Sequence, residues 1–510
     1  MMISAYLVTA LLALSPTADP AMAAGEPVVL TLQNAIDLAL EQSYEARRER
    51  LILLSSEQNV QAQKGRFRTQ ANLTLNAPYF QQDVQSFRIP DEVPYYNTVG
   101  TLRWQSQLRI TQPLPTDGRF ALVSNLYHSR ESVFKDQEDF TDKAKRFYSS
   151  FRLEFSQPLL VPNSLKLGME RANLQYEQAQ RQYLRTELDV VYEVTAAFYS
   201  LYSATRRLEI TDQEVKQQEE TNDLAQRKFG AGLIPEVEAL QTEVDLAQSH
   251  NRRLEAEGAL LRTEDEFKMT VGLLLDEKVA VKTDFAMTEF QVDEQMAIDH
   301  GLKNRSEIRE GQINRRLAEI TLKETDARST IHADISAYYD LTGVSDPYLE
   351  YGSSVSQFFH SSISDLKRRP RNRGVTFTVS LPLWDSGVNR AEVAAARATL
   401  DRNELTESEN VRQVTQQIKA VLTRLQETRG RVDVLRRTQE VAERSYAISQ
   451  ARFDNGDITS QELALDRERL TQSRTNYLQA YIDYQLAAAD LKRNTLYDWE
   501  KGQSLVRDNF

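Results

Sequence analysis

Cysteine is absent from this chain of 510 residues. Its absence excludes disulfides, thiolate metal sites, cysteine nucleophiles and lipid attachment to an N-terminal cysteine. The sequence also has no GxxxxGK loop of the kind that binds phosphates. The five histidines are His128, His250, His300, His332 and His360. No two of them lie at the close helical spacing typical of a metal site. We therefore predict a protein that is not an enzyme and that uses no metal and no cofactor.

Glycine and proline are also scarce, with 18 and 14 residues respectively. Several ordinary globular domains would need more turns than these residues provide, so the composition favours long uninterrupted helices. The formal net charge of −12 leaves no protein-wide positive field to collect phosphates. We expect no nucleic-acid partner.

The N-terminus carries an apolar run from Ile3 to Leu14. Small residues follow and end in Ala21–Ala24, which has the A-x-A form of a signal-peptide cleavage site. We predict a signal peptide over residues 1–24, and the alternative is a buried N-terminal helix. No later segment has the roughly 18 consecutive apolar residues of a membrane-spanning helix. Such an exported chain is either a periplasmic protein or a contributor of strands to a β-barrel.

The sequence repeats itself at a constant spacing of 224 residues. In the first copy the matching residues are Phe151, Leu153, Phe155, Pro158, Leu159, Lys228, Phe229, Gly232, Ile234 and Glu238; in the second they are Val375, Phe377, Val379, Pro382, Leu383, Arg452, Phe453, Gly456, Ile458 and Glu462. A second repeat relates 36–73 to 298–335 at a spacing of 262. Register kept over such distances without an insertion indicates a rigid rod. We predict a first structural repeat over 25–285 and a second over 286–510. The difference between the two spacings leaves 38 extra residues between the outer strands of the first repeat.

Long helices fill most of each repeat. The segments 158–232 and 382–456 each advance 74 residues, about 110 Å if each is a single helix. Apolar residues in the second segment follow the coiled-coil spacing: Val411, Val414, Ile418, Val421, Leu425, Val432 and Leu435. Periodic return segments follow each glycine, with Leu240, Val244, Ala247, Leu254 and Leu261 in one copy and Leu463, Leu470, Tyr477, Tyr481 and Tyr484 in the other. Two half-length helices, 32–69 and 296–330, complete the pattern.

This pattern predicts antiparallel coiled-coil pairs with glycine turns at one end and strands at the other. One chain has too little apolar surface to bury four helices around a closed core, so several chains side by side would form a wall with a wet inner face. The alternative is a solvated coiled coil without a channel.

Alternating segments join the helices at 71–79, 147–157, 333–341 and 374–381. They are 8 to 11 residues long, close to the 9–11 of a tilted membrane strand, although a half-buried soluble sheet shows the same alternation. Four strands cannot close a barrel, because the smallest have about eight, so a barrel requires oligomerisation. We expect the extra residues to form a further hairpin around a turn at 115–118. The sequence leaves open whether this hairpin joins the barrel wall.

A basic run lies just before the last of these segments, with Lys367, Arg368, Arg369, Arg371 and Arg373. It is either a solvated loop or a contact with anionic lipid headgroups, which attract basic clusters. The run is too isolated to indicate DNA binding.

The chain resembles the TolC-like outer-membrane efflux proteins over nearly all of its length after the signal peptide. The resemblance is carried by the opening segment Leu30–Leu40, the paired segments Gln157–Leu160 and Leu381–Trp384, and the Phe-x-x-Gly turns. Members of that family are trimers, whose strands form one outer-membrane β-barrel and whose helices form a periplasmic α-barrel. The resemblance implies an internally duplicated α+β membrane protein of this architecture, in the outer membrane with helices extending into the periplasm.

The same resemblance implies the function of an outer-membrane channel in a tripartite efflux or type I secretion system. Such a channel is a passive export duct from the periplasm to the exterior. Its implied partners are two further copies of the chain, a periplasmic adaptor, an inner-membrane transporter and outer-membrane lipid. The exported substrate stays open.

Carboxylates just past the turns help to close the tunnel in that family, and the matching residues here are Glu238 and Glu462. Clustered carboxylates repel one another and attract cations, so a ring of them tunes opening and selectivity. The alternative is two ordinary acids on solvated helices. The match to the family's latch is partial, because Phe453 lacks a hydroxyl group and Ile458 stands where an arginine is expected. Asp457 is a further candidate for an ionic closure.

The resemblance places adaptor docking at the turns, around Gly232, Leu233, Asn455 and Gly456. A different class of function competes with the channel: a soluble periplasmic coiled-coil adaptor or scaffold. Such a protein shares the signal peptide and the helical hairpins, but lacks two copies of alternating strands. Sedimentation with outer membranes as a heat-sensitive trimer separates the channel from the adaptor.

Overall fold

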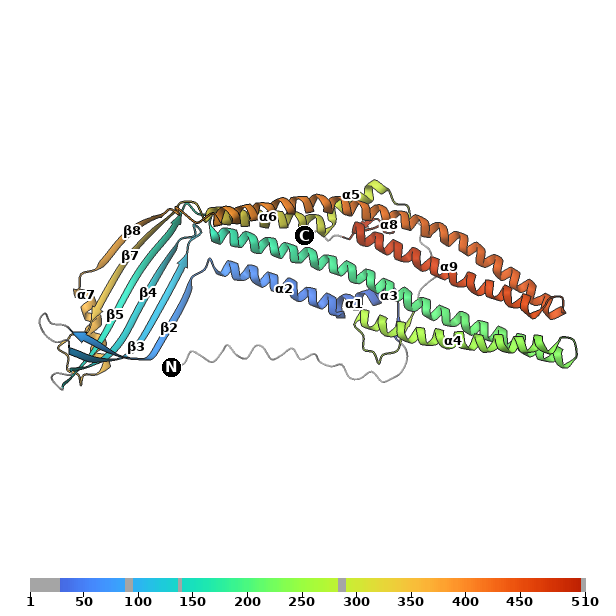
Figure 1. The fold of residues 1–510 in the computed structure, drawn as a ribbon, viewed down its shortest axis with the longest axis horizontal. Coiled ribbons are helices and arrows are strands. Elements are labelled where there is room, and N and C mark those ends of the chain that lie inside the picture. Colours follow the sequence, from blue (N-terminus) through green and yellow to red (C-terminus); the bar gives the residue numbers. More distant parts are fainter. Residues whose placement is uncertain (1–27, 88–94, 136–139, 283–289, 506–510) are drawn as a thin grey trace. The chain divides into compact units, whose positions relative to one another are not determined.

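The computed structural model describes residues 28–87, 95–135, 140–282 and 290–505 (Figure 1). The predicted signal peptide lies outside these residues. The chain divides into two compact units, which we describe separately. The sheet unit comprises residues 51–181 and 306–411, and the hairpin unit comprises residues up to 50, 182–305 and from 412 onwards.

The sheet unit contains one six-stranded antiparallel sheet (Figure 1). In chain order its strands are β2 (Gln70–Phe87), β3 (Tyr95–Pro113), β4 (Arg119–Lys135), β5 (Phe140–Leu159), β7 (His332–Val344) and β8 (Asn372–Ser380). They lie side by side in the same order, so β2 and β8 form the edges. The described part of the chain thus contributes six strands to this sheet, where the sequence indicated four and a hairpin of open position. That hairpin, β3 and β4, is paired along its whole length in the middle of the sheet, which satisfies its backbone N–H and C=O groups.

Two strands are much longer than predicted. β2 has 18 residues and β5 has 20, whereas the alternating segments suggested 71–79 and 147–157. Both extra lengths pair with the β3–β4 hairpin, as in the register that joins Phe140 to Lys135. A strand can continue past its clean apolar alternation when a neighbour supplies backbone partners.

The sheet has one apolar and one polar face. Leu153 of β5 lies opposite Leu122 of β4 and Tyr339 of β7, and alternate residues continue this apolar face along every strand. Its exposed apolar side chains include Leu73, Leu75, Phe80, Trp104, Phe120, Leu122, Leu153, Val375, Phe377 and Val379. The opposite face carries Asn72, Thr74, Gln105, Gln107, Arg152, Glu154, Asp334, Ser336, Thr376 and Thr378. An exposed apolar face of this extent needs lipid or another protein to cover it.

Four helices join the sheet at one end. α2 (Tyr44–Gly65) leads into β2, and β5 leads into α3 (Ser164–Gly230). In the second repeat α6 (Ser306–Ala327) leads into β7, and β8 leads into α8 (Val388–Asn455). Ion pairs hold α6 against both long helices: Arg309 Nε lies 2.6 Å from Glu177 of α3, and Arg315 Nε lies 3.3 Å from Glu407 of α8. Among the described helices, none combines the length and hydropathy needed to cross a membrane.

A short helix, α7 (Val355–Arg368), connects β7 to β8 where the sequence indicated only a loop. Ser354 begins it with a capping box, in which Ser354 Oγ accepts from the Gln357 N–H and Gln357 Oε1 accepts from the Ser354 N–H.

The hairpin unit contains two antiparallel helical hairpins, as predicted. α3 turns back into α4 (Glu236–Val271), and α8 turns back into α9 (Ser460–Thr495). In the first hairpin Arg253 Nε donates to Asp212 over 2.7 Å, and in the second Arg474 Nη2 lies 3.3 Å from Glu443. The 224-residue sequence repeat therefore corresponds to two copies of one helical hairpin.

The main apolar core of the hairpin unit lies where α1 (Leu32–Gln42), α3, α4 and α9 meet. Its largest buried side chains are Phe198, Phe267 and Tyr481. A short parallel pair covers it, formed by β1 (Val28–Leu30) and β6 (Val279–Val281). The unit also contains α5 (Glu294–Asn304) and a small pair of strands, β9 (Tyr497–Asp498) and β10 (Gln503–Ser504).

Both predicted half-length helices are broken, and at the same repeat position. The first divides into α1 and α2 at Ser43, and the second divides into α5 and α6 at Arg305, which is 262 residues later. Both residues have extended backbones, with φ −61° and ψ 144° at Ser43 and φ −67° and ψ 134° at Arg305. Neither break carries the glycine or proline that usually marks one in a sequence.

The two return helices bury different kinds of side chain. In α9 the predicted stripe packs on its own chain, because Leu463 and Leu470 are 0% and 3% exposed. The stripe of α4 does not pack on its own chain, because Leu240 and Leu254 are 52% and 62% exposed. The buried side of α4 is instead mainly small or polar near the turn, with Ala239, Thr242, Ser249 and Ala256.

Candidate functional site

The two hairpin turns have the same backbone geometry. Gly232 and Gly456 adopt φ of 72° and 85°, which glycine tolerates without strain. The Gly232 N–H donates to Phe229 and the Gly456 N–H to Phe453, over 2.8 and 3.0 Å. In both copies the N–H of the next residue donates to the carbonyl oxygen five residues back: Leu233 to Lys228 over 2.9 Å, and Asp457 to Arg452 over 2.8 Å. These bonds complete a Schellman motif.

Glu462 is held within its own helix terminus. Its carboxylate accepts from the Thr459 N–H over 3.1 Å, and the Thr459 hydroxyl accepts from the Glu462 N–H. This capping box satisfies two N–H groups at the start of α9 and places the acid near the positive end of the helix dipole.

Glu238 stands at the equivalent position but makes a different contact. The residue equivalent to Thr459 is Pro235, which has no N–H for a capping box and makes no side-chain cap. The Glu238 carboxylate instead accepts from the Ser460 N–H over 3.1 Å. One acid of the first hairpin thus caps the return helix of the second.

Phe453 lies in an apolar cluster at the second turn. It is 2% exposed and packs with Tyr446, Leu463 and Leu470. Ile458 lies against the same cluster, so the position where the family resemblance expects an arginine serves packing in this chain.

Lys228 provides a second link between the hairpins. Its Nζ donates to the Phe453 carbonyl oxygen over 2.7 Å and lies 4.5 Å from the centre of the Phe453 ring. A cation over an aromatic face is attracted to it electrostatically. Lys228 and Glu238, both from the first hairpin, therefore contact the second hairpin at Phe453 and Ser460.

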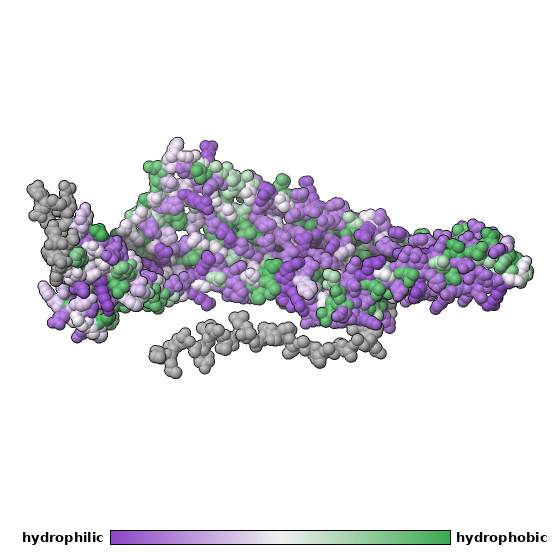
Figure 2. Space-filling view, turned by 60° about the horizontal axis from the view of Figure 1, so that its bottom comes forward, coloured by the Kyte–Doolittle hydropathy of each residue, from purple (hydrophilic) through white to green (hydrophobic). Residues whose placement is uncertain are grey.

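The residues assigned to docking lie at the ends of the hairpins. Leu233 is 73% exposed and Val237 72% exposed, and Figure 2 shows hydrophobic surface over the hairpin ends. Gly456, Asn455 and Asp457 form the second turn, which is exposed and polar. The two turns thus share a backbone and differ in surface chemistry.

Sequence reasoning missed a buried arginine behind the second turn. Arg467 of α9 is 7% exposed, and its Nη1 has no hydrogen-bond partner among the described residues. Burial lowers the pKa of Arg467, while the nearby Tyr446 and Glu214 act in the opposite direction. Its spacing was the available signal, because it falls between Leu463 and Leu470 on the buried stripe of α9.

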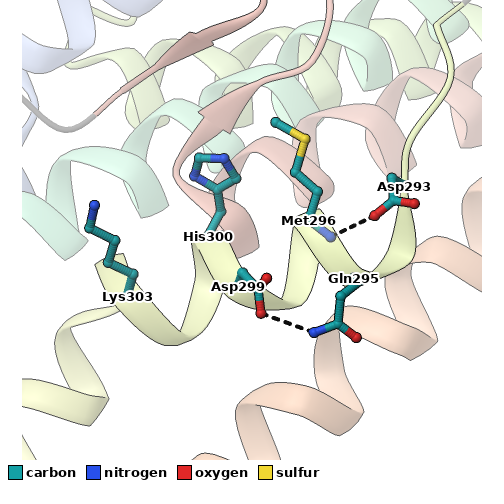
Figure 3. A pocket seen from close by; sticks show the side chains of 6 residues that line it. All are labelled: Asp293, Gln295, Met296, Asp299, His300 and Lys303. Carbon is teal, nitrogen blue, oxygen red and sulfur yellow. Dashed lines mark hydrogen bonds between the residues drawn. The ribbon is translucent and has the colours of Figure 1, made fainter.

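One pocket lies on the surface of the hairpin unit beside α5, with a volume of about 420 Å³. Figure 3 shows two of its contacts: the Met296 N–H donates to Asp293, and Gln295 Nε2 donates to Asp299. The His300 ring lies 4.5 Å from the Tyr497 ring, centre to centre. Across the described ranges, no three histidine or acidic residues group like metal ligands.

Comparison with known proteins gives one consistent family. The family model described as "Outer membrane efflux protein" matches residues 125–272 and 347–495, together more than half of the chain. The chain is 23% identical over 338 residues to the outer membrane protein OprJ of Pseudomonas aeruginosa, covering 65% of this chain and 67% of OprJ.

Two solved structures extend the likeness to the fold. The CmeC outer membrane channel of Campylobacter jejuni aligns with a TM-score of 0.68 and 12% identity, over 93% of this chain and 87% of CmeC. A membrane protein of Pseudomonas aeruginosa aligns with a TM-score of 0.67 and 14% identity, over 93% of this chain and 92% of that protein. The family match and the six-stranded sheet set aside the periplasmic adaptor. The chain belongs to the outer membrane efflux protein family, as a channel whose sheet lies in the outer membrane and whose helices extend into the periplasm.

Proposed function

We propose that three copies of this channel close a single barrel of eighteen strands and export solute passively through it. An inner-membrane transporter powers the export, and a periplasmic adaptor joins the two at the hairpin turns. The observation that carries this proposal is the sheet: six strands, two edges and one continuous apolar face.

The edges of the sheet suit a ring. β2 and β8 each have one side without a partner strand in the described chain. A head-to-tail contact between β8 of one copy and β2 of the next closes a ring when the rotation fits. β8 has nine residues, the length of a tilted membrane strand, so its pairing with β2 spans the apolar layer.

The two faces suit a water-filled wall. The polar face is crossed by side-chain links, such as Arg152 Nη2 to Asp340 over 3.2 Å and Arg109 Nη1 to Glu154 over 3.1 Å. In the proposed barrel this face lines the lumen, so these charged groups remain hydrated as well as paired with one another. Barrels of sixteen to eighteen strands leave an aqueous channel, whereas eight strands leave an interior filled by side chains.

The helical hairpins also present surfaces for neighbouring copies. α8 carries Val434, Val441 and Ile448, seven residues apart and 63–66% exposed. α4 carries the exposed stripe that does not pack on its own chain, with Leu240, Val244, Leu254 and Leu261. Stripes at coiled-coil spacing on two helices of one unit support a wall of packed hairpins.

The absence of cysteine makes the ring directly testable. We expect single cysteines introduced in pairs, one at Asn72, Thr74 or Asn76 and one at Thr376, Thr378 or Ser380, to give a covalent trimer on oxidation in outer membranes. All six residues lie on the edge strands. A matched control pair on the central strands, Gln105→Cys with Arg152→Cys, gives no link between chains. Dimers alone, or no product from any edge pair, would contradict the closed trimer.

The first turn is the better candidate for adaptor docking. Leu233 is exposed and apolar, and its repeat equivalent is the charged Asp457. A buried charge at an interface costs more than a lost contact. We expect Leu233→Asp to weaken adaptor binding at least tenfold in a pull-down from periplasmic extract, and Asp457→Asn to change it little. If Leu233→Asp bound the adaptor as tightly as Asp457→Asn does, the first turn would not be the docking point.

A further inference from the structure

Helix α7 packs on the apolar face of the sheet. Ser362 Oγ lies 2.7 Å from Ser149 Oγ and donates to the Gly343 carbonyl oxygen over 3.2 Å. Phe358 is 1% exposed beneath the helix. Ser149 and Gly343 alternate with the polar-face residues and share their face with Leu153 and Tyr339. The side of the sheet that faces lipid therefore carries α7.

The register gives the height of α7 in the membrane. From the Leu159–Ala333 pair, at the helix end of the sheet, to the Ser149–Gly343 pair there are ten residues on each strand. Ten residues advance about 33 Å, which at a tilt of about 40° is about 25 Å along the membrane normal. Barrels have an apolar band of about that height, so α7 lies at the level of the outer headgroups.

Five cations follow from the end of α7 into β8. They are Lys367, Arg368, Arg369, Arg371 and Arg373, all exposed. Arg369 pairs with Asp365 of α7. In the described part of the chain, Lys367, Arg371 and Arg373 form no ion pair. Arg373 shares the lipid-facing side with Val375, and long basic side chains can extend along apolar surface to reach a headgroup.

We propose that α7 and this basic run bind a phosphorylated lipid of the outer leaflet. Its acyl chains lie against Val375 and Phe377, which are 78% and 62% exposed. Its phosphates contact Lys367, Arg371 and Arg373, since arginine binds phosphate through paired N–H groups. The match has two parts: cations that run from the end of α7 at headgroup height down to Arg373, which pairs with Tyr339 four residues below Gly343, and apolar side chains below those cations. A free anion does not need the second part. The proposal depends on the outer-membrane location and not on the adaptor or the gate.

The experiment titrates purified detergent-solubilised trimers with diphosphorylated lipid A and counts bound lipid by native mass spectrometry. We expect saturable binding that weakens at least tenfold in Lys367→Gln/Arg371→Gln/Arg373→Gln. A matched control, Lys216→Gln/Arg437→Gln/Arg444→Gln, removes one lysine and two arginines from exposed helical positions and leaves binding unchanged. Dephosphorylated lipid A binds wild type at least tenfold more weakly.

A second variant tests the position of the helix without touching its charges. A side chain at residue 343 would place its Cβ 2.1 Å from the Ser362 carbonyl oxygen, so Gly343→Val displaces α7. We expect it also to weaken lipid binding while pore conductance stays unchanged. Equal affinity of wild type and the triple variant, or equal binding of dephosphorylated lipid, overturns the proposal. Saturation by millimolar inorganic phosphate in competition with lipid would indicate an anion site instead.

Discussion

The two hairpin turns are built on one backbone and held together by different chemistry. Around the second turn an apolar cluster buries Tyr446, Phe453 and Leu463. The equivalent residues of the first turn are Asn222, Phe229 and Ala239, of which Phe229 is 40% exposed. There, hydrogen bonds replace packing: Gln218 Nε2 donates to the Thr242 carbonyl oxygen, and the Thr242 hydroxyl donates to Asn222.

This contrast indicates which hairpin moves more easily. A hydrogen bond contributes about 1 kcal/mol net, because water offers the same bond when it breaks. A buried aromatic side chain contributes several times that amount. The second turn is therefore the more rigid, and the polar contacts that tie the first turn to it include those of Lys228 and Glu238. We infer that opening of the tip begins with release of these two links.

Substitution of the two equivalent phenylalanines has the largest expected effect. Phe453→Ala removes a buried ring and should destabilise the second hairpin locally by about 3–5 kcal/mol. Phe229→Ala, the matched control, should cost less than about 1 kcal/mol because that ring is partly exposed. Hydrogen–deuterium exchange of residues 446–470 measures the first effect, and exchange of the equivalent residues 222–246 measures the second. Similar protection in the two variants would show that the apolar cluster does not rigidify the second turn.

The two equivalent acids have the next largest expected effect. Glu238→Ala removes the link to Ser460, whereas Glu462→Ala removes only a cap within α9, and each loss costs about 0.5–2 kcal/mol. We therefore expect Glu238→Ala to raise the open probability of the reconstituted channel severalfold and Glu462→Ala to change it less. In the double variant, loss of both carboxylates should also reduce cation block in single-channel recordings. Unchanged gating and block in the double variant would remove both acids from the gate.

Exchange of the cap gives the smallest effect and the most specific test. Pro235 has φ −71° and ψ 155°, close to the −81° and 161° of Thr459, so Pro235→Thr fits without strain. It supplies the missing N–H and hydroxyl, and the Glu238 carboxylate then turns to its own helix, for a gain of about 1 kcal/mol there. The Ser460 amide should exchange with solvent a fewfold faster. An unchanged exchange rate of the Ser460 amide would show that Pro235 is not the reason why Glu238 caps the second hairpin. Pro235→Ala, which restores the N–H but not the hydroxyl, is the control.

Much of the fold could be predicted from residue spacing. The 224-residue repeat located both long helices and both turns, and the Schellman bonds recur at that spacing. Alternation identified the lipid-facing and polar sides of β8. Breaks at Ser43 and Arg305 could not be predicted, since neither residue disfavours a helix strongly. The exposure of the α4 stripe was also invisible, because a coiled-coil spacing shows that a stripe seeks a partner and not which chain supplies it.

The candidate site divides in the same way. Spacing placed Glu238, Phe453 and Glu462 at the turns, but Lys228 acquired its role only through a carbonyl oxygen 225 positions away in the chain.

By itself the sequence determined the duplicated order of helices and strands, because periodicity and turn chemistry act over a few neighbouring residues. Only the tertiary structure decided that the extra hairpin lies within the sheet, that α7 covers its apolar face and that Glu238 caps the other hairpin. Those outcomes depend on which residues far apart in the sequence the folded chain brings together. Patterns among neighbouring residues do not specify these contacts.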